Sequence, residues 1–184
     1  MPHANKVLFL QGAGAGAHDD CIQLVQSLIR ALGADYDVIY PLMPDEADPQ
    51  FVTWSQAITQ QIEQLGSGMI VGHSFGGAVL IHTLAKHGRL LNNITGIVLI
   101  AAPFLGEGGW DSDDVTLVEG WANPLSTFPV HLFQGDKDQI VAAGHADLYA
   151  AAMPNAHVHS MPGRDHLMNN DLAEVAATIR NLTP

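Results

Sequence analysis

Residues 69–77 constrain the fold more strongly than any other part of the chain. They read Met-Ile-Val-Gly-His-Ser-Phe-Gly-Gly and lead into the apolar run Ala78–Ile81. The first three residues are typical of a buried strand, and the run after Gly77 begins a helical pattern. A strand that passes through Gly-x-Ser-x-Gly into a helix turns sharply and leaves the serine at the tip of a sheet. Only very small side chains fit two residues before and after that serine, which accounts for Gly72 and Gly76.

Apolar runs of strand length alternate with helical patterns through most of the chain. The expected strands are residues 6–10, 36–40, 69–72, 94–101, 129–133 and 156–160. The expected helices begin at Asp19 or Asp20, at Asp48-Pro49, at Ala78, at Ala142 and near Asn170. Strands that are buried on both faces and joined by helices form a parallel sheet with right-handed crossovers. The sequence therefore predicts an α/β fold, a three-layer α/β/α sandwich with about six mostly parallel strands.

One segment interrupts this alternation. No linker or internal repeat divides the chain, so we expect residues 1–184 to form a single domain. Residues 103–127 are rich in glycine and aspartate and contain Trp110 and Trp121. Loops of this length are usually functional or mobile. We expect residues 103–127 to be a short flap-like insertion over the serine, and the alternative is a solvated excursion on the surface.

The composition indicates a globular protein that binds neither nucleic acid nor membranes. Of the 184 residues, 47% are hydrophobic and 14% are charged, and the formal net charge is -12. Nucleic acids and anionic membranes attract clustered Lys and Arg, which this acidic chain offers sparingly. The single cysteine, Cys21, excludes an intrachain disulfide. The apolar run Val7–Leu10 is too short for a signal peptide, so we expect a cytoplasmic protein.

A nucleophilic serine needs a base that takes its proton and a carboxylate that orients the base. In a parallel sheet such groups gather at the carboxyl ends of the strands. After the fifth expected strand come Asp136 and Asp138, and after the sixth comes His166. The third residue of a Gly-x-x-Asp turn has left the strand and can curl toward the histidine, which favours Asp138 over Asp136. Ser74, Asp138 and His166 are therefore the predicted catalytic residues.

Two other histidines are candidates for a different role. His157 and His159 lie inside the expected strand 156–160 and cannot easily reach the loops at its end. Their spacing puts both on one side of the strand, which is also compatible with a pair of metal ligands. Because no third ligand follows at a suggestive spacing, we expect no metal.

The loop after the first strand, Gln11-Gly12-Ala13-Gly14-Ala15-Gly16, allows two interpretations. A dinucleotide-binding turn requires Gly-x-Gly-x-x-Gly and an acid near the end of the next strand. Here the third glycine comes one residue early, and the second strand ends in Tyr40-Pro41. In the serine interpretation, the loop supplies a backbone N–H from Ala13, which joins the N–H of Phe75 as an oxyanion hole. We therefore predict that this loop contributes to an oxyanion hole.

These features together resemble the α/β-hydrolases over essentially the whole chain. Among them, the chain is most similar to small, nearly cap-less serine hydrolases of the retinoblastoma-binding-protein-9 type. The similar features are the glycine-rich loop, Met43-Pro44-Asp45, Gly72-His73-Ser74, Gly135-x-x-Asp138 and Gly163-x-x-His166. The chain departs from the common pattern at Phe75-Gly76-Gly77 and at Gln11, where many members carry histidine. The resemblance implies a minimal α/β-hydrolase fold and carboxylesterase-like activity on short acyl esters without a cofactor.

The leading hypothesis is a serine hydrolase that cleaves small carboxylic esters or thioesters through an acyl-enzyme intermediate. An amidase, a peptidase or an acyltransferase would use the same triad. A non-catalytic binding protein on the hydrolase fold is the alternative from another class. The expected partner is a small-molecule ester, and no protein partner follows from the sequence. Large apolar residues near the expected site are candidate substrate-binding residues, although packing explains them equally well: Phe104, Trp110, Trp121 and Met168.

Overall fold

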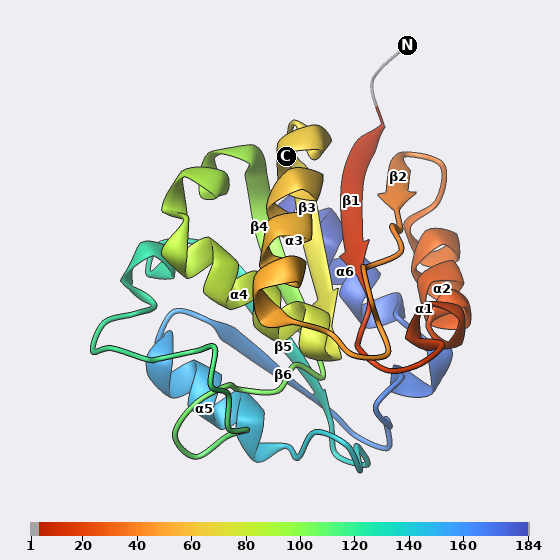
Figure 1. The fold of residues 1–184 in the computed structure, drawn as a ribbon. Helices are drawn as coiled ribbons and strands as arrows, with labels where there is room; N and C mark the ends of the chain where they lie inside the picture. The colour runs from red at the N-terminus through yellow and green to blue at the C-terminus, as the bar shows by residue number, and fades with distance from the viewer. Residues whose placement is uncertain (1–3, 184) are drawn as a thin grey trace.

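A six-stranded sheet runs through the centre of the molecule (Figure 1). The computed structural model describes residues 4–183. Its strands are β1 (Asn5–Leu10), β2 (Tyr36–Ile39), β3 (Gly68–His73), β4 (Ile94–Ile100), β5 (Val130–Gly135) and β6 (His157–Met161). They lie in the order β2-β1-β3-β4-β5-β6, and every neighbouring pair is parallel. The predicted sheet of six parallel strands is confirmed.

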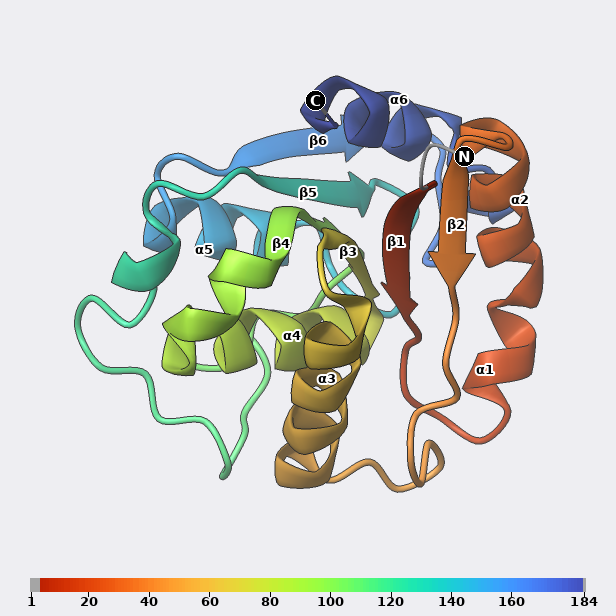
Figure 2. The ribbon, with the colours of Figure 1, turned by 90° about the horizontal axis from the view of Figure 1, so that it is seen from above.

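Helices cover both faces of this sheet (Figure 2). The α-helices are α1 (Ala17–Asp20), α2 (Ile22–Leu32), α3 (Phe51–Leu65), α4 (Ser74–Lys86), α5 (Gly144–Ala152) and α6 (Ala173–Leu182). Three 3-10 turns are η1 (Gly88–Asn93), η2 (Asn123–Leu125) and η3 (Met168–Asn170). The apolar stripes of α2 and α6 pack on one face, and those of α3, α4 and α5 pack on the other. Within residues 4–183, no helix combines the length and the apolar character needed to span a membrane.

The central strands explain why the fold needs both helical layers. Every residue of β3 is buried. Ile70 packs into the core beneath α3 and α4, whereas its neighbour Val71 packs into the core beneath α2 and α6. Successive side chains of a strand point to opposite faces, so a continuous apolar run requires cover on both sides. The three-layer sandwich follows from that run.

Several helix starts differ from the sequence prediction, among them those of α4, which begins at Ser74 and not at Ala78, and of α5, which begins at Gly144 and not at Ala142. The third helix begins at Phe51 with Gln50 as its N-cap, because the N–H of Asp48 closes a turn onto the carbonyl of Asp45 (3.0 Å). Asp48-Pro49 therefore precedes the helix and does not start it. The last helix begins at Ala173 and not near Asn170. Residues 168–170 have left-handed backbone angles, with φ between 52° and 55°, which a right-handed helix cannot include.

Residues 103–127 connect β4 to β5 and are tied at their start to α5. The hydroxyl of Tyr149 donates to the carbonyl of Pro103 (2.8 Å), and the N–H of Phe104 donates to Nδ1 of His145 (2.9 Å). A tight loop then brings Trp110 back beside Leu105, where the two form an isolated bridge. The beginning of the segment is thus held against the helical layer.

Candidate active site

Ser74 lies directly after β3 and is the first residue of α4. Its φ of 51° is left-handed, which is costly for a residue with a side chain and marks a sharp turn. Glycine is required around it: a Cβ on Gly72 would lie 2.5 Å from Cα of Gly77, and a Cβ on Gly76 would meet the carbonyl oxygen of Gln11. The backbone around these glycines therefore leaves no space for larger side chains, as the sequence pattern predicts.

His166 and Asp138 form a hydrogen-bonded pair. Nδ1 of His166 lies 2.9 Å from Oδ2 of Asp138, whose side chain is fully buried (0% exposed). The same carboxylate accepts hydrogen bonds from Nε2 of Gln134 (3.1 Å) and from the N–H groups of Ile140 (2.8 Å) and Val141 (2.9 Å). An ionised carboxylate only accepts, so His166 carries its proton on Nδ1. Its Nε2 is left with a lone pair that can take a proton.

The surroundings of Asp138 keep it ionised. Burial opposes the charge, but the hydrogen bonds from His166, Val141 and Ile140 outweigh it and lower the pKa of Asp138. A carboxylate that stays ionised can both fix the histidine tautomer and stabilise an imidazolium. The pair therefore has the electrostatic character that a general base and its orienting acid require.

Ser74 and His166 line one pocket of about 840 Å³ at the carboxyl edge of the sheet. Ala13, Phe75 and Trp110 line the same pocket. Within the described part of the chain, the Ser74 hydroxyl makes no hydrogen bond to His166. Catalytic hydrogen bonds are often loose in unliganded enzymes and tighten when substrate binds. The pocket thus brings together the serine, the histidine and both residues predicted for the oxyanion hole.

Backbone donors surround Ser74. Phe75 is the second residue of α4, and the first N–H groups of a helix have no acceptor within it. The loop after β1 passes close by, because a Cβ added to Gly12 would lie 3.0 Å from Cβ of Ser74 and 3.5 Å from its Oγ. Both predicted N–H donors, those of Ala13 and Phe75, belong to segments that line the serine pocket.

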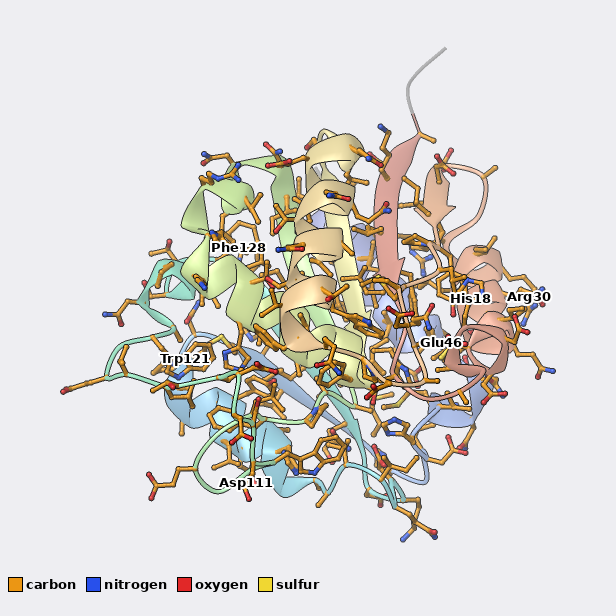
Figure 3. The ribbon with its side chains drawn as sticks, viewed as in Figure 1. His18, Arg30, Glu46, Asp111, Trp121 and Phe128 are labelled. Carbon is orange, nitrogen blue, oxygen red and sulfur yellow. The ribbon has the colours of Figure 1, made fainter. Side chains whose placement is uncertain are left out.

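Only one of the four candidate substrate-binding residues lines the pocket, and that residue is Trp110. Phe104 is 5% exposed and packs edge-on against Tyr149, with ring centroids 5.1 Å apart. Trp121, labelled in Figure 3, stacks on His82 at 4.7 Å. Met168 is 1% exposed in the core beneath α2 and α6. The position of a residue after a strand indicates which loop reaches the pocket, but it does not indicate which side chains turn inward.

His73 is a polar residue of the site that the sequence did not single out. Nε2 of this buried side chain lies 3.0 Å from the carbonyl oxygen of His166, and Nδ1 lies 3.6 Å from Sγ of Cys21. Burial, and then the nearby His166, lower the pKa of His73 to about 4. The ring is therefore neutral, donates through Nε2 and holds the backbone of the His166 loop. Its place directly before Ser74 was the only signal in the sequence.

Charged residues around the pocket were also missed: Asp20, Lys137 and Asp165. They come from the end of α1 and from the loops after β5 and β6, so no sequence spacing groups them. Asp165 accepts hydrogen bonds from the N–H groups of Leu167 (3.0 Å) and Asn169 (2.8 Å), which shapes the loop around His166.

His157 and His159 lie away from the pocket, on β6. Nε2 of His159 lies 2.9 Å from Nδ1 of His131 on β5, and the His159 ring stacks on Phe133 with centroids 4.2 Å apart. Among residues 4–183, no group of three or more His, Cys, Asp or Glu side chains is arranged to hold a metal ion. The hydrogen-bond partner of His159, His131, was not foreseen: the register of β5 and β6 sets His131 opposite His157, and its ring also reaches His159 diagonally.

Solved structures share this fold across almost the whole chain. The meta-cleavage product hydrolase from Pseudomonas fluorescens IP01 matches with a TM-score of 0.69 and 17% identity, covering 98% of this chain and 89% of that one. An esterase from Rhodococcus sp. ECU1013 matches with a TM-score of 0.69 and 16% identity, covering 98% and 92%. An α/β serine hydrolase without a lid from Xanthomonas campestris matches with a TM-score of 0.64 and 16% identity, covering 99% and 84%. These likenesses show the minimal α/β-hydrolase fold.

Sequence comparison assigns the family. No curated protein matches the chain. The family model described as serine hydrolase matches residues 31–172, a span that includes the strained Ser74 and the His166–Asp138 pair. The chain therefore belongs to the serine hydrolase family.

Proposed function

We propose that this protein hydrolyses small carboxylic esters or thioesters through an acyl-enzyme on Ser74. The observation that carries the proposal is the 2.9 Å hydrogen bond between His166 and the buried Asp138, at a pocket that Ser74 also lines. This arrangement leaves the free lone pair of His166 on the nitrogen remote from Asp138. A serine at a strained elbow beside such a base is the arrangement that nucleophilic acyl transfer uses.

The reaction has two halves in this proposal. Oγ of Ser74 forms a bond to the acyl carbon while Nε2 of His166 takes the hydroxyl proton. The tetrahedral oxyanion accepts hydrogen bonds from the N–H groups of Ala13 and Phe75. The carbon–oxygen or carbon–sulfur bond then breaks, and the leaving group takes the proton from His166. In the second half, His166 takes a proton from a water molecule while the water oxygen attacks the acyl carbon. The bond to Oγ of Ser74 then breaks, Oγ takes the proton from His166, and the acid leaves.

The pocket and its surroundings support the proposed substrate class. A volume of about 840 Å³ suits a small molecule. We propose residues 103–127 as a short flap within a single domain, with Trp110 as the part that contacts substrate. An esterase and a lid-less serine hydrolase are among the proteins that share the fold. Soluble short-chain esters fit this open site better than bulky triglycerides.

A burst experiment tests the proposal. Mixing the enzyme with p-nitrophenyl acetate under pre-steady-state conditions should release one equivalent of nitrophenol per enzyme in a fast phase. Intact mass spectrometry of the quenched enzyme should show one acetyl group, and peptide mapping should place it on Ser74. Matched anilide and thioester substrates then rank the leaving groups. Turnover without an adduct on Ser74 would reject the acyl-enzyme route, and the absence of any turnover would favour a non-catalytic binding protein.

A further inference from the structure

The loop from Gln11 to His18, here called the glycine loop, forms one wall of the pocket. Gly12, Ala13 and Ala17 line it. Gly14 and Gly16 have φ values of 131° and 81°, so the loop is rich in residues with wide conformational freedom. Such a loop does not hold an oxyanion donor in place by itself, because each glycine adds backbone entropy that must be overcome.

Glu46 supplies the missing restraint from another part of the chain. Its Oε1 accepts the N–H of Gly16 (3.0 Å), and its Oε2 accepts the N–H of His18 (2.8 Å) and Nε2 of Gln11 (2.5 Å). Its backbone carbonyl accepts the N–H of Gly14 (2.7 Å). Figure 3 shows Glu46 and His18 next to each other at α1. One residue therefore binds both ends and the middle of the glycine loop.

The segment before Glu46, which includes Met43 and Pro44, is itself anchored by hydrogen bonds. Oε1 of the buried Gln11 accepts the N–H of Met43 (3.2 Å), whose side chain is 2% exposed. The carbonyl of Pro44 accepts Nε1 of Trp54 in α3 (2.6 Å). The segment that carries Glu46 is thus anchored in the core beneath α3 and can transmit that rigidity to the glycine loop. Gln11, which departs from the family pattern, takes part in this network.

Among the described residues, the N–H of Ala13 is one of the loop donors that these bonds leave free. The N–H groups of Gly14, Gly16 and His18 are all bound to Glu46, whereas the N–H of Ala13 has no acceptor within the described residues. Ala13 lines the pocket beside Ser74. Glu46 therefore restrains the loop on both sides of the free Ala13 N–H, through its carboxylate at Gln11, Gly16 and His18 and through its backbone carbonyl at Gly14.

We propose that Glu46 is a positioning residue that holds the Ala13 N–H where the oxyanion develops; the inference rests on the proposed hydrolase function. Glu46 does not touch substrate in this account. It acts through the glycine loop, so its effect belongs to the transition state, where the oxyanion carries charge, and not to ground-state binding. The N–H of His18 first, then Gln11 and the N–H of Gly16, hold the pKa of Glu46 below its usual range, which keeps it an acceptor.

The test compares Glu46→Gln and Glu46→Ala with Glu63→Gln. Glu63 pairs with Arg89 on the surface of α3 and lies outside the pocket lining, so its variant is the matched loss of one charge. The Glu46→Gln side chain keeps the shape of glutamate, but its amide NH₂ replaces one of the two accepting oxygens. That NH₂ then faces an N–H donor of the loop, and a hydrogen bond is lost. With p-nitrophenyl acetate we expect kcat to fall about tenfold in Glu46→Gln and up to about 100-fold in Glu46→Ala, with KM within about twofold.

A transition-state analogue separates positioning from simple stabilisation. Phenylboronic acid adds to the serine hydroxyl and carries a negative charge where the oxyanion forms, so its affinity should fall by the same factor as kcat. Glu46→Asp, which restores the carboxylate, should recover part of the loss. Glu63→Gln should match the wild type in kcat and in boronate affinity.

The outcomes distinguish this inference from the proposed function. Folded Glu46 variants with wild-type kcat, or with only a lower melting temperature, would overturn the positioning role while acylation of Ser74 still stands. A rise in KM at unchanged kcat would also overturn it. A wild-type enzyme that forms no acyl-enzyme would instead remove the proposed function on which the inference depends.

Discussion

The carboxylate of Asp138 differs from its acidic neighbours in the hydrogen bonds it accepts. It receives donors from His166, Gln134, Ile140 and Val141. Asp136, two residues earlier, receives the N–H of Gly163 (2.6 Å) and joins two loops. At the residue scale, the roles of these acids are therefore set by their partners and not by their distance along the chain from the histidine.

A paired substitution tests the assignment of the acid. We expect Asp138→Asn to lower kcat by about 10² to 10⁴. The His166 ring would lose both the acceptor that fixes its proton on Nδ1 and the negative charge that stabilises the imidazolium. Asp136→Asn should change kcat only mildly, since Asp136 contacts the backbone of Gly163. Steady-state kinetics on both folded variants measure the difference. The opposite ranking would assign the orienting role to Asp136 and leave Ser74 and His166 in place.

His82 offers a test of stability against pH. It is 8% exposed, its Nε2 has no hydrogen-bond partner among residues 4–183, and burial lowers its pKa to about 4. In the unfolded chain the same imidazole takes up a proton near pH 6.5, whereas in the native state it stays neutral down to about pH 4. The free energy of unfolding is therefore unaffected by this group above pH 6.5 and decreases as the pH falls from 6.5 toward 4. The loss amounts to about 3 kcal/mol for one such group.

His82→Phe should remove that share of the pH dependence. Phenylalanine keeps the aromatic contact with Trp121 and cannot be protonated. Urea unfolding at pH 7 and at pH 4.5 measures the change in free energy for the variant and for the wild type. We expect a smaller difference between the two pH values in the variant. An equal difference in both proteins would show that His82 does not contribute.

At the scale of whole elements, the sequence predicts the strands better than it predicts the ends of helices. The β3–turn–α4 unit was predictable because Gly-x-Ser-x-Gly between an apolar strand and a helix is typical of this one sharp turn. Residues 168–170 were not, because three consecutive left-handed residues without glycine carry no sequence signature. The fold of the sheet follows from local patterns, whereas these helix ends depend on tertiary contacts.

The elbow gives a prediction at this scale. A Cβ on Gly72 would lie 2.5 Å from Cα of Gly77, where only backbone movement makes room, so Gly72→Ala should destabilise the protein by about 1 to 3 kcal/mol. Gly88→Ala is the matched control, because its Cβ would meet only Pro124 at 3.6 Å. Urea unfolding compares the two variants. Equal stability of both would mean that the β3–α4 contact yields more easily than its geometry indicates.

In the site, too, residues that belong to local motifs could be predicted from the sequence, whereas residues that act through tertiary contacts could not. Ser74, Asp138 and His166 were predicted from residue type and from their places after strands. Glu46 was not, because its partners lie 28 to 35 residues away and no motif links them. Trp121 and Met168 entered the prediction as large apolar residues near the site, and both pack in the interior or against a helix.

At the scale of the whole molecule, the order of the strands assembles the pocket. The carboxyl ends of β1, β3, β5 and β6 lie at one edge of the sheet, and the residues that follow each strand reach the pocket, in loops after β1, β5 and β6 and at the start of α4 after β3. These segments bring Ala13, Ser74, Lys137 and His166 together from positions spread over most of the chain. A parallel sheet gathers its loops in this way, which is why ligands bind at this edge.

The Ser74→Ala substitution tests whether Ser74 is the nucleophile of this site. We measure ester hydrolysis and labelling by a fluorophosphonate probe in the wild type and in the variant, after circular dichroism has confirmed that both are folded. We predict that kcat falls by about 10³ or more and that labelling disappears, because the attacking oxygen is gone. A folded Ser74→Ala enzyme that keeps most of its esterase activity and its labelling would show that Ser74 is not the nucleophile.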